Sequence, residues 1–125
     1  MSSTDRITLS APPLQITLGR SSDATKHATI VGEIDLATAP LLRHQLICAM
    51  HDQTLDLLNI DFSGVRFLDC AGIGALIHVR NTAVQSGRRV CLTHAQPIVR
   101  RILDVTGLLR FLTADPNELE PDAPP

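Results

Sequence analysis

The feature that most constrains the fold is residues 55–62, an almost continuously apolar run interrupted by Asp56, Asn59 and Asp61. Such a run is typical of a central strand that is covered on both faces, as strands of a parallel sheet are. Residues 71–85 follow it with apolar side chains at helical spacing. A buried strand that leads directly into a helix indicates an α/β domain.

The composition fits one folded domain. The chain has 125 residues, of which 44% are hydrophobic and 19% are charged, and it is long enough to bury a core without disulfides or a metal. With three Phe, no Trp and no Tyr, it lacks the aromatic faces on which single-stranded nucleic acid or sugars stack. The net charge of −2 gives no attraction for a phosphate backbone, so nucleic-acid binding is disfavoured.

The sequence shows no targeting segment or membrane anchor. Residues 1–6 lack the apolar core of a signal peptide, and no apolar run approaches the length of a membrane span. We therefore expect a cytoplasmic protein. Its cysteines, Cys48, Cys70 and Cys91, form no CxxC or Cys/His ligand pattern, which suits a reducing compartment and predicts no metal site.

Two strands are predicted before the central run. Residues 14–18 and 27–34 each alternate apolar and polar side chains, the period of a half-buried strand. No helical pattern lies between them, so we expect an antiparallel pair joined by a long polar turn at residues 19–25.

A helix is predicted over residues 38–52. Thr38 is expected to cap its free backbone N–H groups, and Pro40 lies in the first turn, where the missing N–H costs nothing. The buried face is expected to consist of Leu42, Leu46, Ala49 and Met50.

After the central run the pattern predicts a helix at 71–85, a strand at 90–93 and a helix at 97–105. Gly87 and Gly107 are expected to end the two helices. The buried faces are expected to be Ile73, Leu76, Ile77, Ala83 and Val84 in the first, and Ile98, Ile102, Leu103 and Val105 in the second. The order predicts a single α/β domain with a mixed, mostly parallel sheet of four to five strands and three to four helices, lying preferentially on one face.

The domain is expected to occupy residues 14–114. Residues 1–13 are expected to be a flexible segment with a short strand at 7–9, and a final short strand is expected at 108–112. Residues 115–125 are acidic and rich in proline, so we expect a disordered tail with at most one helical turn.

The junction between the central strand and the following helix is the predicted functional site. Asp69 and the thiol of Cys70 come directly before a small residue and two glycines, Gly72 and Gly74. A strand that delivers an acid and a nucleophile-sized side chain to a helix N-terminus is where α/β domains often place a functional site. Ser63 is expected to end the strand by bonding the backbone of the turn.

Two segments resemble the STAS domain family. Residues 32–42 resemble its GxhD…TA…L segment, and residues 61–76 resemble its signature, D-L-S-x-V-x-F-h-D-S-[ST]-G-h-[GA]-x-L. The resemblance covers about residues 14–112. The family includes bacterial anti-sigma factor antagonists, stressosome subunits, a lipid-transport subunit and the cytoplasmic tails of sulfate transporters.

The resemblance implies a bacterial regulator of transcription that binds an anti-sigma factor and frees its sigma factor. The anti-sigma factor of such pairs is often a histidine-kinase-like ATPase that phosphorylates the Ser after the motif Asp. No enzyme activity or cofactor of the chain itself is implied. The residues that would contact the partner are Asp35, Asp69, Cys70, Ala71, Gly72, Ile73 and Gly74.

Cys70 and Ala71 stand where the family has hydroxyl residues, so control by Ser phosphorylation is expected to be lost or replaced. A phosphate would bring a charge of nearly −2 beside two carboxylates, and without it the site resembles the binding-competent state. Two interpretations of Cys70 stay open: a small uncharged substitute for Ser, which we favour, and a redox gate.

Alternatives to this function are a subunit of a lipid-transport complex, a signalling scaffold and a small thiol enzyme. A thiol enzyme is disfavoured because no His base can be placed beside Cys70. Asp35 and Asp69 are interpreted as caps or contact charges in preference to a catalytic pair. The two glycines, Gly72 and Gly74, match no complete phosphate-binding motif, and close approach of a partner explains them equally well. Dimerisation through an edge strand stays open.

The remaining polar and thiol side chains are expected to be structural or solvated. Cys48 and Cys91 are expected to pack in the interior, and Arg100 and Arg101 to form a solvated helix face. The histidines are expected at the surface, with none paired with another at helical ligand spacing; they are His27, His44, His51, His78 and His94.

Overall fold

The computed structural model describes residues 14–108. The predictions for residues 1–13, including a strand at 7–9, for nearly all of a strand at 108–112 and for residues 115–125 concern positions outside this range. Within the described range, no helix is both long enough and apolar enough to cross a membrane.

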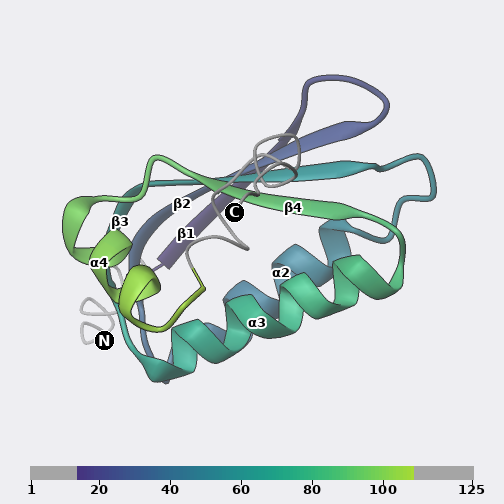
Figure 1. The fold of residues 1–125 in the computed structure, drawn as a ribbon. Helices are drawn as coiled ribbons and strands as arrows, with labels where there is room; N and C mark the ends of the chain where they lie inside the picture. Colours follow the sequence, from purple (N-terminus) through teal and green to yellow (C-terminus); the bar gives the residue numbers. More distant parts are fainter. Residues whose placement is uncertain (1–13, 109–125) are drawn as a thin grey trace, which may run out of the picture.

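Residues 14–108 form one mixed sheet of four strands in the order β1-β2-β3-β4 (Figure 1). The strands are β1 (Leu14–Arg20), β2 (Thr25–Ile34), β3 (Leu57–Leu68) and β4 (Arg89–Thr93). β1 pairs antiparallel with β2, whereas β2 with β3 and β3 with β4 pair in parallel. The predicted class, an α/β domain with a mixed and mostly parallel sheet, is confirmed.

The described chain has three helices, α2 (Ala39–Ala49), α3 (Cys70–Gln85) and α4 (Pro97–Val105). Figure 1 shows α2 and α3 running beside each other along one face of the sheet, with α4 beyond one end of it. The three predicted helices are therefore present. α2 ends at Ala49 and not near Asp52, because the chain turns there and the Lys26 ammonium donates to the carbonyl of Ala49 at 2.9 Å.

β3 is longer than its apolar run, and two predictions about it are wrong. It continues through Leu68, so Ser63 does not end the strand. Pairing with β2 carries the strand onward, across register shifts, to the pair of Ile34 with Leu68. Burial alternates along it, with fully buried residues such as Leu58 and Phe62 between half-buried or exposed ones. The helices thus cover one face of β3, and its other face is only partly shielded. The prediction of a strand covered on both faces is therefore wrong.

The turn between β1 and β2 is shorter than residues 19–25. The ladder runs to the pair of Arg20 with Lys26, which leaves a connection of four residues, 21–24. The Arg20 guanidinium donates to the carbonyl of Asp23 at 2.8 Å, which holds the short turn closed.

The buried faces of α3 and α4 were predicted only in part: Leu76, Ala83 and Leu103 are buried as expected, and other predicted residues are not. α3 packs with small residues, including Gly72, Ala75 and Ala83, while Val84 is 58% exposed. Ile77 is exposed as well, and in α4 so are Ile98 and Val105, whereas Val99 and Leu103 are buried. Large aliphatic residues were assigned to the core from hydrophobicity, but small residues bring α3 close to the sheet. The face predicted for α2 is buried as expected: Leu42, Leu46, Ala49 and Met50.

An acidic residue fixes the end of the sheet where β2 and β3 begin. The Asp52 carboxylate bonds the Arg20 guanidinium, lies 3.7 Å from the Lys26 ammonium and accepts from the Thr54 hydroxyl at 2.7 Å. The hydrogen bond from Arg20, followed by those from Thr54, holds the pKa of Asp52 well below its usual range. These contacts join the β1–β2 hairpin to the connection between α2 and β3.

Candidate functional site

The β3–α3 junction is built around the side chain of Asp69. Asp69 is extended, with φ −112° and ψ −169°, and its Oδ1 accepts from the N–H of Ala71 at 2.9 Å and of Gly72 at 3.1 Å. It is therefore the N-cap of α3, and Cys70 is the first helical residue. The N–H of Asp69 also donates to the carbonyl of Ile34 at 3.2 Å, which ties the end of β3 to the end of β2.

The β2–α2 junction uses a second aspartate. Oδ1 of Asp35 accepts from the N–H of Ala37 at 2.9 Å and of Thr38 at 3.0 Å. Thr38 does not cap the helix with its side chain, so that prediction is wrong. Its hydroxyl instead donates to the carbonyl of Glu33 at 2.8 Å and accepts from the N–H of Asp35 at 2.9 Å. Thr38 is 5% exposed, so its hydroxyl bonds hold a buried turn together.

The structure brings Asp35 and Asp69 to the same edge of the sheet. They follow Ile34 and Leu68, which are partners at the ends of the two parallel strands. Each carboxylate is bonded to backbone N–H groups of the turn that follows it. This arrangement supports the interpretation of Asp69 as a cap, whereas Asp35 bonds the turn before α2 and does not cap that helix. Among residues 14–108, no three His, Cys, Asp or Glu side chains are grouped so that they could hold a metal ion.

The expected contact residues after Asp69 differ in accessibility. Cys70 and Gly74 are exposed, Ala71 and Ile73 are half-buried, and Gly72 is buried. Exposure of Cys70 at the first position of α3 places its thiol where a partner can reach it. Gly72 is covered by the chain itself and offers no side chain to a partner.

Gly72 is required by packing within the chain. A Cβ atom at this position would lie 2.4 Å from Cδ1 of Leu68 and 2.7 Å from Cγ2 of Ile34. Such distances are far below van der Waals contact, so the helix start can approach the strand ends only without a side chain here. The close approach that Gly72 permits is therefore to Leu68 and Ile34 of the same chain, and approach of a partner is not needed to explain this glycine. A Cβ atom added at Gly74 would have nothing within 4 Å.

Exposed apolar side chains accompany this edge of the sheet, and none of them is among the predicted site residues. Leu36, in the turn after Asp35, is 79% exposed, and Phe67, beside the end of β3, is 47% exposed. Leu41, in the first turn of α2, is 44% exposed. We call Asp35, Leu36, Phe67, Cys70 and Gly74 the junction surface. Phe67 could have been found by strand alternation, since it neighbours the inward-pointing Leu68.

The predicted burial of the other cysteines and of the histidines is confirmed in part. Cys91 is buried as expected, but Cys48 is exposed, and its Sγ lies 3.7 Å from Nε2 of His44. The prediction that Cys48 packs in the interior is wrong because its position on α2 faces away from the sheet. All five histidines are exposed, as expected; they are His27, His44, His51, His78 and His94.

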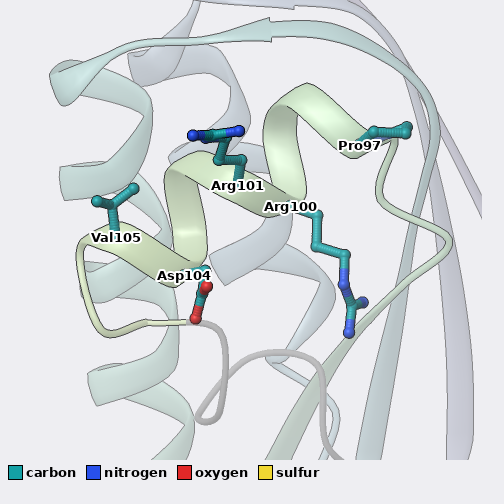
Figure 2. Close-up of a pocket in the computed structure, with 5 residues that line it drawn as sticks. All are labelled: Pro97, Arg100, Arg101, Asp104 and Val105. Atoms are coloured by element: carbon teal, nitrogen blue, oxygen red, sulfur yellow. The ribbon is translucent and has the colours of Figure 1, made fainter.

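The outer face of α4 has a shallow hollow lined by Pro97, Arg100, Arg101, Asp104 and Val105. Figure 2 shows the two arginine side chains pointing in different directions from the helix. Arg100 and Arg101 are both exposed, in agreement with a solvated face. Since they do not converge, they form no evident anion site.

Comparison with known proteins gives consistent relatives. The family model described as STAS domain matches residues 21–120. An anti-sigma F factor antagonist of Paenibacillus polymyxa is 25% identical over 88 residues, which are 70% of this chain and 75% of that protein. An anti-sigma-B factor antagonist of Bacillus subtilis (strain 168) is 32% identical over 79 residues, 63% of this chain and 71% of that protein.

A solved structure resembles the fold as well. The crystal structure of an anti-sigma factor antagonist from Mycobacterium paratuberculosis superposes with a TM-score of 0.67 at 28% identity. The match covers 88% of this chain and 94% of that one. The resemblance therefore extends over nearly all of both chains.

Proposed function

The chain belongs to the STAS domain family, and on that premise we propose that it is an anti-sigma factor antagonist. It binds an anti-sigma factor and thereby frees the sigma factor which that regulator holds. Relatives of this kind at 25% to 32% identity support the proposal. The antagonist and the sigma factor compete for the anti-sigma factor, so the amount of free sigma factor depends on the difference between their two affinities.

The observation that carries the proposal is the exposed first residue of α3, Cys70, beside the end of β2, where Asp35 bonds the turn that follows. Asp69 satisfies the free N–H groups of Ala71 and Gly72, which leaves Cys70 projecting from a rigid position. Leu36 and Phe67 add exposed apolar area at the same edge of the sheet. Apolar side chains among fixed polar groups are what a protein interface needs, because burial of the former adds affinity and the latter add specificity.

We assign the surface to binding and not to catalysis. The two carboxylates that could act as bases are bonded to backbone N–H groups, Asp35 to Ala37 and Thr38, and Asp69 to the start of α3. A nucleophilic thiol needs a base directed at it. Cys70 is instead the first residue of a capped helix.

Serine phosphorylation is proposed to be absent from position 70. A thiol takes the place of the hydroxyl, and the exposed Cys70 is followed by half-buried Ala71. A phosphate there would add nearly two negative charges next to Asp69 and near the strand end that carries Asp35. Without that charge the surface stays in its binding state, and the amounts of the competing proteins determine the outcome.

The test is binding to the regulator recovered from the source organism. The tagged chain is expected to recover an anti-sigma factor of the histidine-kinase-like ATPase type from lysate. With the purified pair, Cys70→Ser should retain the affinity, while Cys70→Asp should weaken it at least about tenfold by placing a like charge in the interface. Isothermal titration calorimetry measures both.

Two outcomes would contradict the proposal. One is recovery of membrane-transporter subunits in place of an ATPase regulator. The other is an unchanged affinity of Cys70→Asp for the recovered regulator. Incubation of the purified pair with ATP adds a check, since the wild type should take up no phosphate at position 70.

A further inference from the structure

A thiol and an imidazole face each other on the outer side of α2, away from the junction surface. His44 and Cys48 are four residues apart on the helix, and both are exposed. Sγ of Cys48 lies 3.7 Å from Nε2 of His44. Cys48 is next to the last residue of α2, whereas Asp35 precedes the other end of that helix. The pair is thus separate from the proposed interface.

The separation of the two atoms matches that of two ligands on one zinc ion. Zn–S bonds of about 2.3 Å and Zn–N bonds of about 2.0–2.1 Å at a tetrahedral angle place S and N about 3.6 Å apart. The observed 3.7 Å differs by far less than the movement that a side chain makes by small torsional changes. One ion can therefore bind both atoms while the helix keeps its backbone.

The ligand types and their spacing lead to the same ion. Thiolate and neutral imidazole are the protein ligands that zinc binds most often, and softer ligands disfavour magnesium and calcium. Residues four apart on a helix lie on one face, and the helix holds them in place before any ion binds. A contact within a rigid element loses little conformational freedom on binding, which favours affinity.

We propose that His44 and Cys48 form a two-ligand site for one divalent zinc ion per chain, with water in the remaining coordination positions. On binding, the Cys48 thiol releases its proton to solvent and the sulfur forms the Zn–S bond. His44 provides the lone pair of Nε2 and keeps its proton on Nδ1. No oxidant or further reactant enters the step.

His51 lies one turn further along the chain, and its N–H donates to the carbonyl of Cys48 at 3.1 Å. Its imidazole is not grouped with the pair, since no three possible ligands come together in residues 14–108. The site therefore has two protein ligands. Substitution of His51 by Ala is expected to leave the zinc affinity unchanged.

The test is zinc titration of the full chain against a chromophoric chelator, with a phosphine reductant that does not bind zinc. One equivalent of zinc should bind, and His44→Ala and Cys48→Ser should each weaken binding at least about tenfold, the least that loss of a direct ligand is expected to cause. The matched controls are His78→Ala and Cys70→Ser, an exposed imidazole and an exposed thiol on α3. Both controls should bind as the wild type does.

Cobalt(II) gives a second measurement that reports the sulfur directly. The wild type and Cys70→Ser should show a thiolate-to-cobalt charge-transfer band that Cys48→Ser lacks. Since the substituted side chains are exposed, thermal unfolding of the variants should match that of the wild type. Equal zinc affinity of wild type and Cys48→Ser, or loss of the band in Cys70→Ser, would overturn the proposal.

Discussion

The β2–α2 and β3–α3 junctions use the same residue type in the same place and present different surfaces. In each, an aspartate directly after a parallel strand accepts two backbone N–H bonds from the chain that follows. After Asp35 the chain makes a turn before the helix begins at Ala39, and the residue at that turn, Thr38, is buried. After Asp69 the helix begins at once, with the exposed Cys70.

The difference shows that the residue at the start of the helix stabilises the fold at one junction, while the other junction has a residue there that does not. The Thr38 hydroxyl bonds Glu33 and Asp35, so the residue before α2 is part of the fold. At the start of α3 the cap belongs to Asp69 and the close packing to Gly72, and the thiol between them contributes to neither. Folding thus depends on Asp69 and Gly72 there, whereas the recognition that we propose uses Cys70.

The largest effect should come from filling the close contact at the β3–α3 junction. Gly72→Val places carbon atoms against Leu68 and Ile34 and should destabilise the protein by about 2–3 kcal/mol, as overpacking of a core does. Gly74→Ala is the matched control in the same turn, with open space around it, and should stabilise the helix by about 0.5–1 kcal/mol. Urea unfolding measures both, and equal effects would show that the contact at Gly72 is not tight.

An intermediate effect is expected from the buried turn at the other junction. Thr38→Val keeps the shape but removes the hydroxyl, leaving the Glu33 carbonyl and the Asp35 N–H without a partner, at a cost of about 1–3 kcal/mol. Cys70→Ser, the corresponding change at the exposed position, should alter the free energy of unfolding by no more than about 0.5 kcal/mol. If the two changes lower the free energy of unfolding equally, it is wrong that Thr38 stabilises the fold while Cys70 does not.

The smallest effect concerns the feature that both junctions share, an aspartate that accepts two backbone N–H bonds. Asp69→Ala should destabilise by about 1 kcal/mol, the usual value of an N-cap. Asp35→Ala should cost about as much, because it removes two hydrogen bonds to the turn before α2. Asp35→Asn and Asp69→Asn should restore most of the loss, because an amide oxygen can accept the same bonds. Thermal unfolding at neutral pH compares the four variants. A much larger loss for either Ala variant would mean that its carboxylate does more than hold a turn.

Much of the fold follows from local patterns in the sequence. Alternation predicted β1 and β2, and α4 has the predicted bounds of residues 97 and 105. The candidate site was predicted because Asp69 and Cys70 lie between a predicted strand and a predicted helix, and the structure has them at that junction. The extension of β3 beyond Phe62 could not be found in this way, since it arises from pairing with β2 and not from apolar side chains.

Predictions failed where contacts between distant segments decide. Thr38 has the right residue type for a cap, but its hydroxyl donates to the Glu33 carbonyl and accepts from the Asp35 N–H. Gly72 gives no sign in sequence of the strand ends that close around it. Cys48 was assigned to the core from residue type alone, although the i+4 spacing to His44 was available as a signal of a shared helix face.

Placing the cap one residue before the exposed position has a consequence for how such a chain changes over generations. The side chain at position 70 takes part in neither the cap nor the close packing. A mutation between cysteine and serine, one nucleotide apart, should therefore change the stability of the fold very little. A lineage can therefore gain or lose a hydroxyl at this position in a single step. The cysteine and serine forms should be equally well folded, because Asp69 and Gly72 are untouched.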